Sequence, residues 1–202
     1  GWYRINAVWY HFADGGQMTI GWINDGGTWY FLHPSGAMAT GWLNLGGDWY
    51  YFLPSGAMAT GWLTYRDNWY WLRSSGGAAV GWTKIGDAWY LFEDDARMLT
   101  GWQLTEDDNR WYYMRSSGQM VTGWLLDAGK WYYLDDEGAM MTGWTKVGDT
   151  WYHLNSSGAM STGWVKDGGS WFYLSSSGAM VTGARWIDGT RYVFDDQGHL
   201  LQ

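Results

Sequence analysis

The dipeptide Gly-Trp recurs nine times in this chain of 202 residues, at a spacing of twenty residues that is broken only once. A tenth copy starts at Gly183, where Ala184 replaces the tryptophan. A fixed short period is typical of repeat proteins, whose units are too small to bury an apolar face alone and therefore stack. We expect one module over residues 1–202, with a degenerate last unit as its cap. The ten units start at Gly1, Gly21, Gly41, Gly61, Gly81, Gly101, Gly123, Gly143, Gly163 and Gly183.

A second tryptophan follows each Gly-Trp, so that eighteen of the twenty tryptophans share one lattice and only Trp71 and Trp186 lie off it. Aromatic residues make up 20% of the chain, and Cys is absent. So many aromatic residues exclude a disordered chain, and the lack of Cys excludes disulfides and thiolate metal sites. A net charge of −8 argues against nucleic-acid binding, which needs a basic surface.

One unit, residues 21–40, shows the expected local structure. Gly21–Asn24 reads as a short strand, and Asp25-Gly26-Gly27 after it as a hairpin turn that needs positive φ. Trp29–Leu32 is rich in β-favouring aromatic residues and reads as the second strand. Pro34-Ser35-Gly36 forms a second turn that leads to the next unit. The sequence therefore predicts an all-β fold, a solenoid of about ten tandem β-hairpins of 20 residues. A lone hairpin is barely stable, so we expect stacking and an elongated array.

Strand alternation assigns two faces to the second strand of each hairpin. Its fourth position is always Leu, Phe or Met and is expected in the core, whereas its variable third position is expected to be half-exposed. His11 and His153 occupy third positions, where we expect solvent exposure. One unit has two extra residues within Thr105–Arg110, which lengthens a loop tip without shifting the lattice on either side.

The recurring tryptophans admit two interpretations. Large aromatic side chains could simply build the core of a thin array. That interpretation explains less well why two indoles recur in every unit, and why the last unit has Ala184 and Arg191 in their places. A cap has no following unit with which to complete a pocket, so losing both rings there is what a binding role predicts.

Aromatic rings arranged as a box bind cations, above all quaternary ammonium groups. Three rings would contribute about −4 kcal/mol, a dissociation constant of about 1 mM. Several such sites on one chain would gain roughly 10² to 10⁴ through avidity for a polymer with repeated head groups. Aromatic faces also stack on sugar rings, so a carbohydrate ligand stays an alternative. A structural spacer or adhesin stalk is a third possibility.

The pattern GW…WYYL…GxMxTGW resembles the choline-binding repeat, also called the cell-wall-binding repeat, over essentially the whole chain. The resemblance implies a left-handed superhelix of β-hairpins and a module that anchors a larger secreted protein to choline or phosphocholine on teichoic and lipoteichoic acids at the bacterial surface. It also implies a non-catalytic chain without cofactors, membrane insertion or nucleic-acid partners, and it allows a homodimer through terminal repeats. The runner-up is a module for glucan or another wall polysaccharide.

In that family a ligand site takes two aromatic residues from one hairpin and one from the next, often with a Met nearby. The resemblance therefore implies nine sites, each with both tryptophans of one unit and the residue after the second tryptophan of the next. The sites are Trp2, Trp9 and Tyr30; Trp22, Trp29 and Tyr50; Trp42, Trp49 and Tyr70; Trp62, Trp69 and Tyr90; Trp82, Trp89 and Tyr112; Trp102, Trp111 and Tyr132; Trp124, Trp131 and Tyr152; Trp144, Trp151 and Phe172; and Trp164, Trp171 and Tyr192. The candidate methionines are Met18, Met38, Met58, Met98, Met120, Met140, Met160 and Met180.

Three departures from the pattern concern these sites. Ala78 stands where Met is expected and Ala96 replaces a turn glycine, so we expect altered pockets nearby. The insertion before Trp111 concerns the site of Trp102, and the last site depends on the cap. No catalytic motif such as HExxH or GxSxG occurs, and the acidic clusters fall in turns, where Asp bonds to the backbone.

Overall fold

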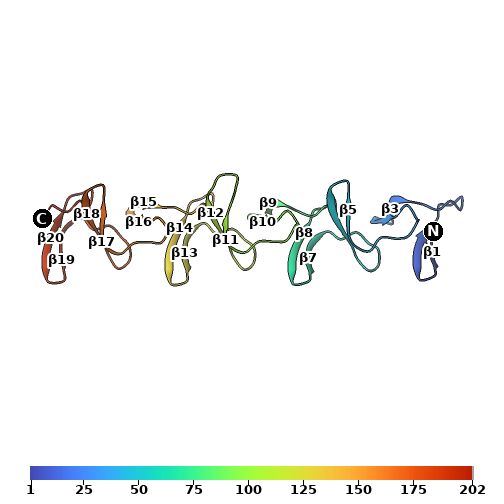
Figure 1. Ribbon diagram of the computed structural model, residues 1–202, viewed down its shortest axis with the longest axis horizontal. Helices are drawn as coiled ribbons and strands as arrows, with labels where there is room; N and C mark the ends of the chain where they lie inside the picture. Colours follow the sequence, from blue (N-terminus) through green and yellow to red (C-terminus); the bar gives the residue numbers. More distant parts are fainter. Residues whose placement is uncertain (202) are drawn as a thin grey trace. The chain divides into compact units, whose positions relative to one another are not determined.

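The computed structural model describes residues 1–201 as an all-β chain of twenty short strands, with no helix in that range (Figure 1). Each strand pairs only with its sequence neighbour, which gives ten separate two-stranded antiparallel sheets. The prediction of about ten tandem β-hairpins is therefore confirmed.

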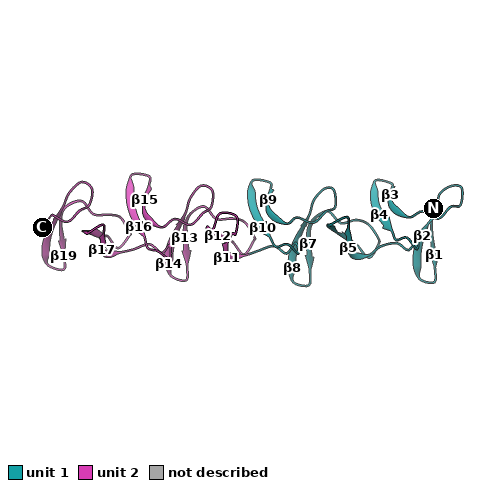
Figure 2. Cartoon of the chain, turned by 45° about the horizontal axis from the view of Figure 1, so that its top comes forward, with its two compact units in different colours: residues 1–99 teal, residues 100–202 magenta. Residues whose placement is uncertain are grey.

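The chain divides into two compact units, Gly1–Leu99 and Thr100–Gln202, each with five hairpins (Figure 2). The hairpins of unit 1 are β1 (Trp2–Ile5) with β2 (Val8–His11), β3 (Gly21–Asp25) with β4 (Thr28–Leu32), β5 (Gly41–Leu45) with β6 (Asp48–Phe52), β7 (Gly61–Tyr65) with β8 (Asn68–Leu72), and β9 (Gly81–Ile85) with β10 (Ala88–Phe92). The hairpins of unit 2 are β11 (Gly101–Leu104) with β12 (Trp111–Met114), β13 (Gly123–Asp127) with β14 (Lys130–Leu134), β15 (Gly143–Val147) with β16 (Thr150–Leu154), β17 (Gly163–Asp167) with β18 (Ser170–Leu174), and β19 (Gly183–Ile187) with β20 (Thr190–Phe194).

Nearly every hairpin closes through a two-residue turn at the predicted place. At the tip of β3–β4 both turn residues have positive φ, 59° at Gly26 and 86° at Gly27. Such turns match the right-handed twist of the paired strands, and glycine adopts them without steric cost. The tip of β7–β8 uses Arg66 and Asp67 at positive φ instead, so the strand pairing imposes this geometry on side chains that disfavour it.

The side chains at the fourth position of the second strand form the core. These side chains are at most 3% exposed in nine hairpins, whereas Phe12 of the first hairpin is half-buried. Most third-position residues are half-buried, as predicted, and Leu91 is buried. The nine buried side chains are Leu32, Phe52, Leu72, Phe92, Met114, Leu134, Leu154, Leu174 and Phe194.

Within each compact unit, a backbone hydrogen bond links every hairpin except the last to the turn one repeat further on. The N–H of Met38 donates to the carbonyl of Trp9 at 2.9 Å, and the N–H of Met58 donates to that of Trp29 at 2.8 Å. The bond persists where the methionine is replaced, from Leu200 to the carbonyl of Trp171 at 2.8 Å. The bond therefore depends on the backbone alone. In these hairpins it fixes the backbone of the second tryptophan and leaves its side chain free to point elsewhere.

The methionine after each hairpin packs against the turn glycine of the next repeat. A Cβ placed on Gly56, whose φ is +84°, would lie 2.2 Å from the Sδ atom of Met38. Ala96 keeps the positive φ of such a turn, at 67°, and it lies in one buried cluster with Ala78. The two departures noted in the sequence are thus one compensated exchange: the added Cβ of Ala96 is accommodated because Ala78 is not a methionine.

This packing predicts coupled effects on stability. Gly56→Ala should lower the free energy of unfolding by about 2–5 kcal/mol, since it adds backbone strain and a steric clash. In the Met38→Ala background the same change should cost at least about 1 kcal/mol less. Denaturant unfolding measures both values. Gly41→Ala is the matched control, because Gly41 has a φ of +75° with open space around it. Equal costs in both backgrounds would contradict the compensation.

The two-residue insertion is organised by Asp108. Its carboxylate accepts hydrogen bonds from the Thr105 hydroxyl at 2.5 Å and from the Tyr112 hydroxyl at 2.7 Å. The guanidinium of Arg110 points away from the loop and donates a hydrogen bond to the Asp135 carboxylate of the following repeat at 2.6 Å. The insertion therefore lengthens the loop as predicted, and β11 and β12 still pair in register around it.

The packing of Tyr112 beside the insertion predicts a raised pKa for its phenol. Burial, together with the hydrogen bond to Asp108, raises the pKa of Tyr112 from 10 to about 12. The neutral phenol is favoured in the folded state, so its stabilising contribution is complete below pH 10 and is lost as the pH rises towards 12. A spectrophotometric titration should lose an ionisation near pH 12 in Tyr112→Phe. Tyr3→Phe, which removes an exposed tyrosine, is the control; identical losses in both variants would contradict the assignment.

Candidate binding slots between successive hairpins

In eight hairpins the first tryptophan lies between two aromatic rings. One belongs to the third position of the second strand of the same hairpin, and in eight hairpins this ring centroid lies 5.1–5.3 Å away. The other belongs to the next hairpin. Trp71, off the tryptophan lattice, is such a third-position partner, of Trp62. His11 and His153 hold the same place against Trp2 and Trp144. They are half-buried like the other third positions, and so less exposed than we expected of these two histidines.

The second ring belongs to the residue that the sequence analysis assigned to the same site. This holds for every pair whose two residues lie in the same compact unit. The centroid distances between the two rings are 4.6–5.1 Å, with the rings tilted or edge-on. The eight pairs are Trp2–Tyr30, Trp22–Tyr50, Trp42–Tyr70, Trp62–Tyr90, Trp102–Tyr132, Trp124–Tyr152, Trp144–Phe172 and Trp164–Tyr192. We call the space bounded by such a pair and the second tryptophan a slot, named after its first tryptophan.

The second tryptophan of each hairpin is exposed. All nine of these side chains have between 41% and 48% of their surface accessible, although indole is the largest apolar side chain available. They are Trp9, Trp29, Trp49, Trp69, Trp89, Trp111, Trp131, Trp151 and Trp171. A residue needed only to fill a core would be buried, so the core alone does not account for this half of the lattice.

The fifth residue of the next hairpin's first strand differs between slots, and the contacts of the first tryptophan differ with it. Where it is aliphatic, the two tryptophans of the slot form a nearly perpendicular pair with centroids 6.1–6.3 Å apart. The pairs are Trp22–Trp29, Trp62–Trp69, Trp124–Trp131 and Trp164–Trp171, and the aliphatic residues are Leu45, Ile85, Val147 and Ile187. Two indoles at right angles form the corner of an aromatic box.

Three slots have Asp at this fifth position. The indole Nε1–H of Trp144 donates to Asp167 at 3.0 Å, and that of Trp2 donates to Asp25 at 2.8 Å. Trp102 makes the same bond to Asp127 at 3.0 Å, so its slot keeps the arrangement of the others despite the neighbouring insertion. Sequence reasoning missed these residues, although their recurrence at one position of the unit was a visible signal.

The Trp42 slot is built differently. Here the fifth residue is Tyr65, whose ring lies 6.3 Å from that of Trp42 and 5.6 Å from that of Tyr51. Ala78 stands in place of the methionine, and Tyr65 packs against the cluster that contains it. The side chains around the Trp42 slot therefore differ from those of the other slots, because the phenol ring of Tyr65 packs against the cluster that contains Ala78.

Two slots of unit 2 open into well-defined cavities. A cavity of about 360 Å³ is lined by Trp124, Trp131, Tyr152 and Met160, with Ser176 and Ser177 at its edge. Another of about 420 Å³ is lined by the equivalent Trp144, Trp151, Phe172 and Met180. Volumes of this size suit a small-molecule head group. Met160 and Met180 thus lie beside the predicted rings, and Met38, Met58 and Met140 hold the same place through the backbone bonds to Trp9, Trp29 and Trp111.

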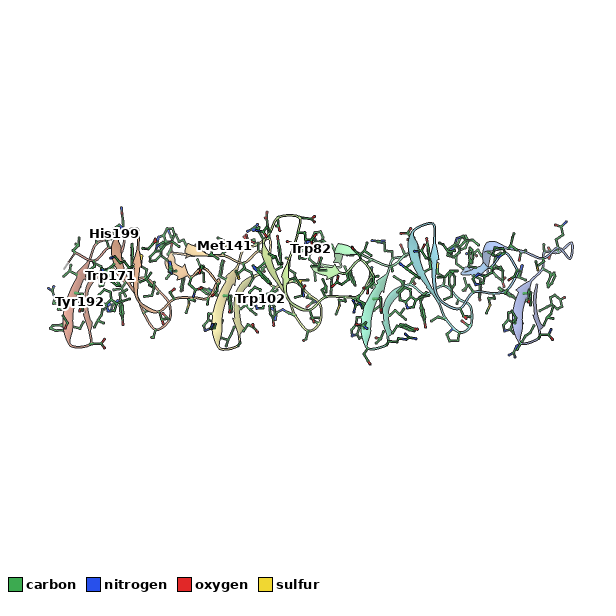
Figure 3. All side chains as sticks on the ribbon, in the orientation of Figure 1. Trp82, Trp102, Met141, Trp171, Tyr192 and His199 are labelled. Atoms are coloured by element: carbon green, nitrogen blue, oxygen red, sulfur yellow. The ribbon has the colours of Figure 1, made fainter. Side chains whose placement is uncertain are left out.

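The remaining predicted sites lie at the ends of the units. Trp82 and Trp89 form a ring pair in unit 1, at 6.5 Å, whereas Tyr112 belongs to unit 2, so their joint site stays a prediction. In the Trp164 slot, Trp171 from β18 and Tyr192 from β20 come from adjacent hairpins (Figure 3), and Leu200 replaces the methionine. The cap therefore completes the last slot with its tyrosine alone.

No group of three or more His, Asp or Glu side chains suited to a metal ion occurs in residues 1–201. Over the same range, no helix could cross a membrane.

The role of the fifth position predicts a change in indole exchange. Asp127→Val should release the Nε1–H of Trp102 from its charged acceptor and raise its hydrogen-exchange rate about tenfold or more. The indole signals in NMR spectra measure this rate, and the signal of Trp124, whose slot already has Val147, serves as the internal control. An unchanged rate at Trp102 would contradict the role assigned to this position.

The repeated sequence pattern matches the model of a known protein family. The sequence model of the choline-binding repeat matches residues 1–41, 39–80, 79–122, 106–142 and 141–182. A comparison with curated protein sequences found no match.

Solved structures agree with this match. CbpJ from Streptococcus pneumoniae TIGR4 is similar at 33% identity and a TM-score of 0.82, over 98% of this chain and 86% of that one. Choline binding protein F from Streptococcus pneumoniae, solved with a peptidoglycan analogue, is similar at 34% identity and a TM-score of 0.78, over 98% and 85% of the two chains. The choline-binding domain of CbpL from Streptococcus pneumoniae is 29% identical with a TM-score of 0.66, over 91% and 98%. Together with the repeated match to the family model, these similarities show that the chain belongs to the choline-binding repeat family.

Proposed function

We propose that this chain is a non-catalytic module whose slots bind choline head groups and so anchor a larger secreted protein to teichoic and lipoteichoic acids of the bacterial surface. The observation that carries the proposal is the exposure of the second tryptophans beside a fixed pair of aromatic rings. An exposed indole costs solubility, and a recurring function is a sufficient reason for keeping nine of them.

The chemistry of the slots favours a quaternary ammonium ligand. A trimethylammonium group is weakly hydrated and has no N–H to satisfy, so aromatic faces and a methionine thioether are suitable walls for it. The Lys166 ammonium already lies 5.7 Å from the ring centroid of Trp171, within the range of a cation–π contact. The net charge of −8 attracts cationic groups and disfavours anionic ones.

Repetition turns weak sites into a strong attachment. Each slot alone would hold choline with a dissociation constant of about 1 mM. A polymer with repeated choline groups can occupy several slots at once, and each bond after the first forms at a high effective concentration. Surface anchoring therefore needs no tight individual site.

Binding to a glucan or another wall polysaccharide is the second candidate, because the same exposed indole faces can stack on sugar rings. It predicts retention on an insoluble glucan that choline does not compete. A neutral sugar lacks the charge that makes a cation–π contact, so the two ligands are distinguishable.

Titration with choline, beside a neutral sugar of similar size, tests the proposal. Choline at tens of millimolar should stabilise the folded state by RT ln(1 + [L]/Kd) for each site, and should therefore raise the melting temperature and change the tryptophan fluorescence. Equilibrium dialysis should show one site fewer in Trp131→Ala. The matched control is Trp186→Ala, which removes an indole that is 71% exposed and lies outside every slot. A wild-type protein that did not respond to choline would refute the proposal.

A further inference from the structure

The Trp144 slot differs chemically from its neighbour, the Trp124 slot. We propose that the Trp144 slot also binds protonated primary amines, cations that carry N–H donors, through the carboxylates of Asp167 and Asp196. The inference rests on the proposed function, because it treats the slots as ammonium sites. It assigns to one slot a ligand class that an uncharged aromatic box rejects.

Two carboxylates line the Trp144 slot beside its aromatic walls. Asp167 comes from the tip of β17 and Asp196 from the turn after β20, and both border the cavity of about 420 Å³. Asp167 uses Oδ2 to accept the indole hydrogen of Trp144 at 3.0 Å. Its Oδ1 accepts no hydrogen bond from residues 1–201, and neither does the Asp196 side chain. The slot therefore offers unused anionic acceptors next to an aromatic surface.

The Trp124 slot provides the comparison within the same unit. Its cavity, of about 360 Å³, has the equivalent aromatic walls but no charged residue in its lining. Val147 stands at the position of Asp167, and Ser176 stands at the position of Asp196 in the corresponding turn. The two slots share one framework but differ in these acceptors and in His199, which also lines the Trp144 slot, pairs with Asp195 at 2.9 Å and stands where the Trp124 slot has Ala179.

The difference matters because a primary ammonium group is strongly hydrated. Its three N–H donors lose water on entering an aromatic box, and a donor left without an acceptor is costly to bury. A carboxylate supplies a charge-assisted hydrogen bond that replaces the lost water. Quaternary ammonium groups have no such donors and need only the rings. Both slots should therefore accept choline, but only the acidic slot should also accept its unmethylated analogue, ethanolamine.

NMR titration of the whole chain tests this inference, because each of the twenty tryptophans gives an indole N–H signal. Loss of one signal in Trp144→Phe and in Trp124→Phe identifies the two reporters. Ethanolamine should shift the Trp144 signal with a dissociation constant at least about tenfold lower than that of any response at Trp124. In the Asp167→Asn/Asp196→Asn variant, ethanolamine affinity should fall about tenfold or more and choline affinity by a smaller factor. Asn at residue 167 keeps an acceptor for the indole.

Two further variants make the result decisive. Asp188→Asn removes one charge at the exposed tip of β19–β20, outside the slot, and should leave the preference for ethanolamine in place. Val147→Asp/Ser176→Asp should make the Trp124 signal respond to ethanolamine. Equal ethanolamine responses at both slots, no response at Trp144, or an undiminished response in the double Asn variant would overturn the inference. If the inference fails but the proposed function holds, choline still shifts the indole signals. If choline shifts no signal while ethanolamine does, the proposed choline binding is refuted and the amine site is not.

Discussion

The structure depends on one contact, the clamping of an indole between two hairpins. In each complete slot within a unit, the first tryptophan lies 5.1–5.3 Å from a ring of its own hairpin and 4.6–5.1 Å from a ring of the next. Isolated two-stranded hairpins are marginal in water, so the stability of these sheets has to come from contacts between them. The clamp supplies apolar burial at that junction and also forms the wall of the slot. Folding and binding are therefore served by the same side chain.

The clamp leaves the second tryptophan free for another role. The core is already filled by fourth-position residues such as Leu32 and Leu134, which are fully buried. The backbone of the second tryptophan is held by the bond from the following turn, while its indole stays more than two-fifths exposed. A side chain with a fixed backbone and an open face is preorganised for a ligand, because little conformational freedom remains to be lost on binding.

One framework accommodates slots with different chemistry. The fifth residue of the first strand is aliphatic, acidic or aromatic in different hairpins, as Val147, Asp167 and Tyr65 illustrate. Each choice changes what the first tryptophan contacts, while the strands of these hairpins keep the same pairing register. Ala78 and Ala96 show the opposite case. They lie where two repeats pack closely, so a change in one required a change in the other.

The sequence alone determined the hairpins, their turns and the core positions, because each of these repeats at a fixed interval and depends on local geometry. The aromatic triplets, with Tyr152 among them, came instead from the resemblance to the choline-binding repeat. Only the tertiary structure decided which side chains meet across the junction of repeats. The bond from Trp144 to Asp167 and the joint exchange at residues 78 and 96 each join residues of different hairpins or turns. Such contacts depend on how one repeat stacks on the next, and the sequence pattern within a single repeat does not contain that information.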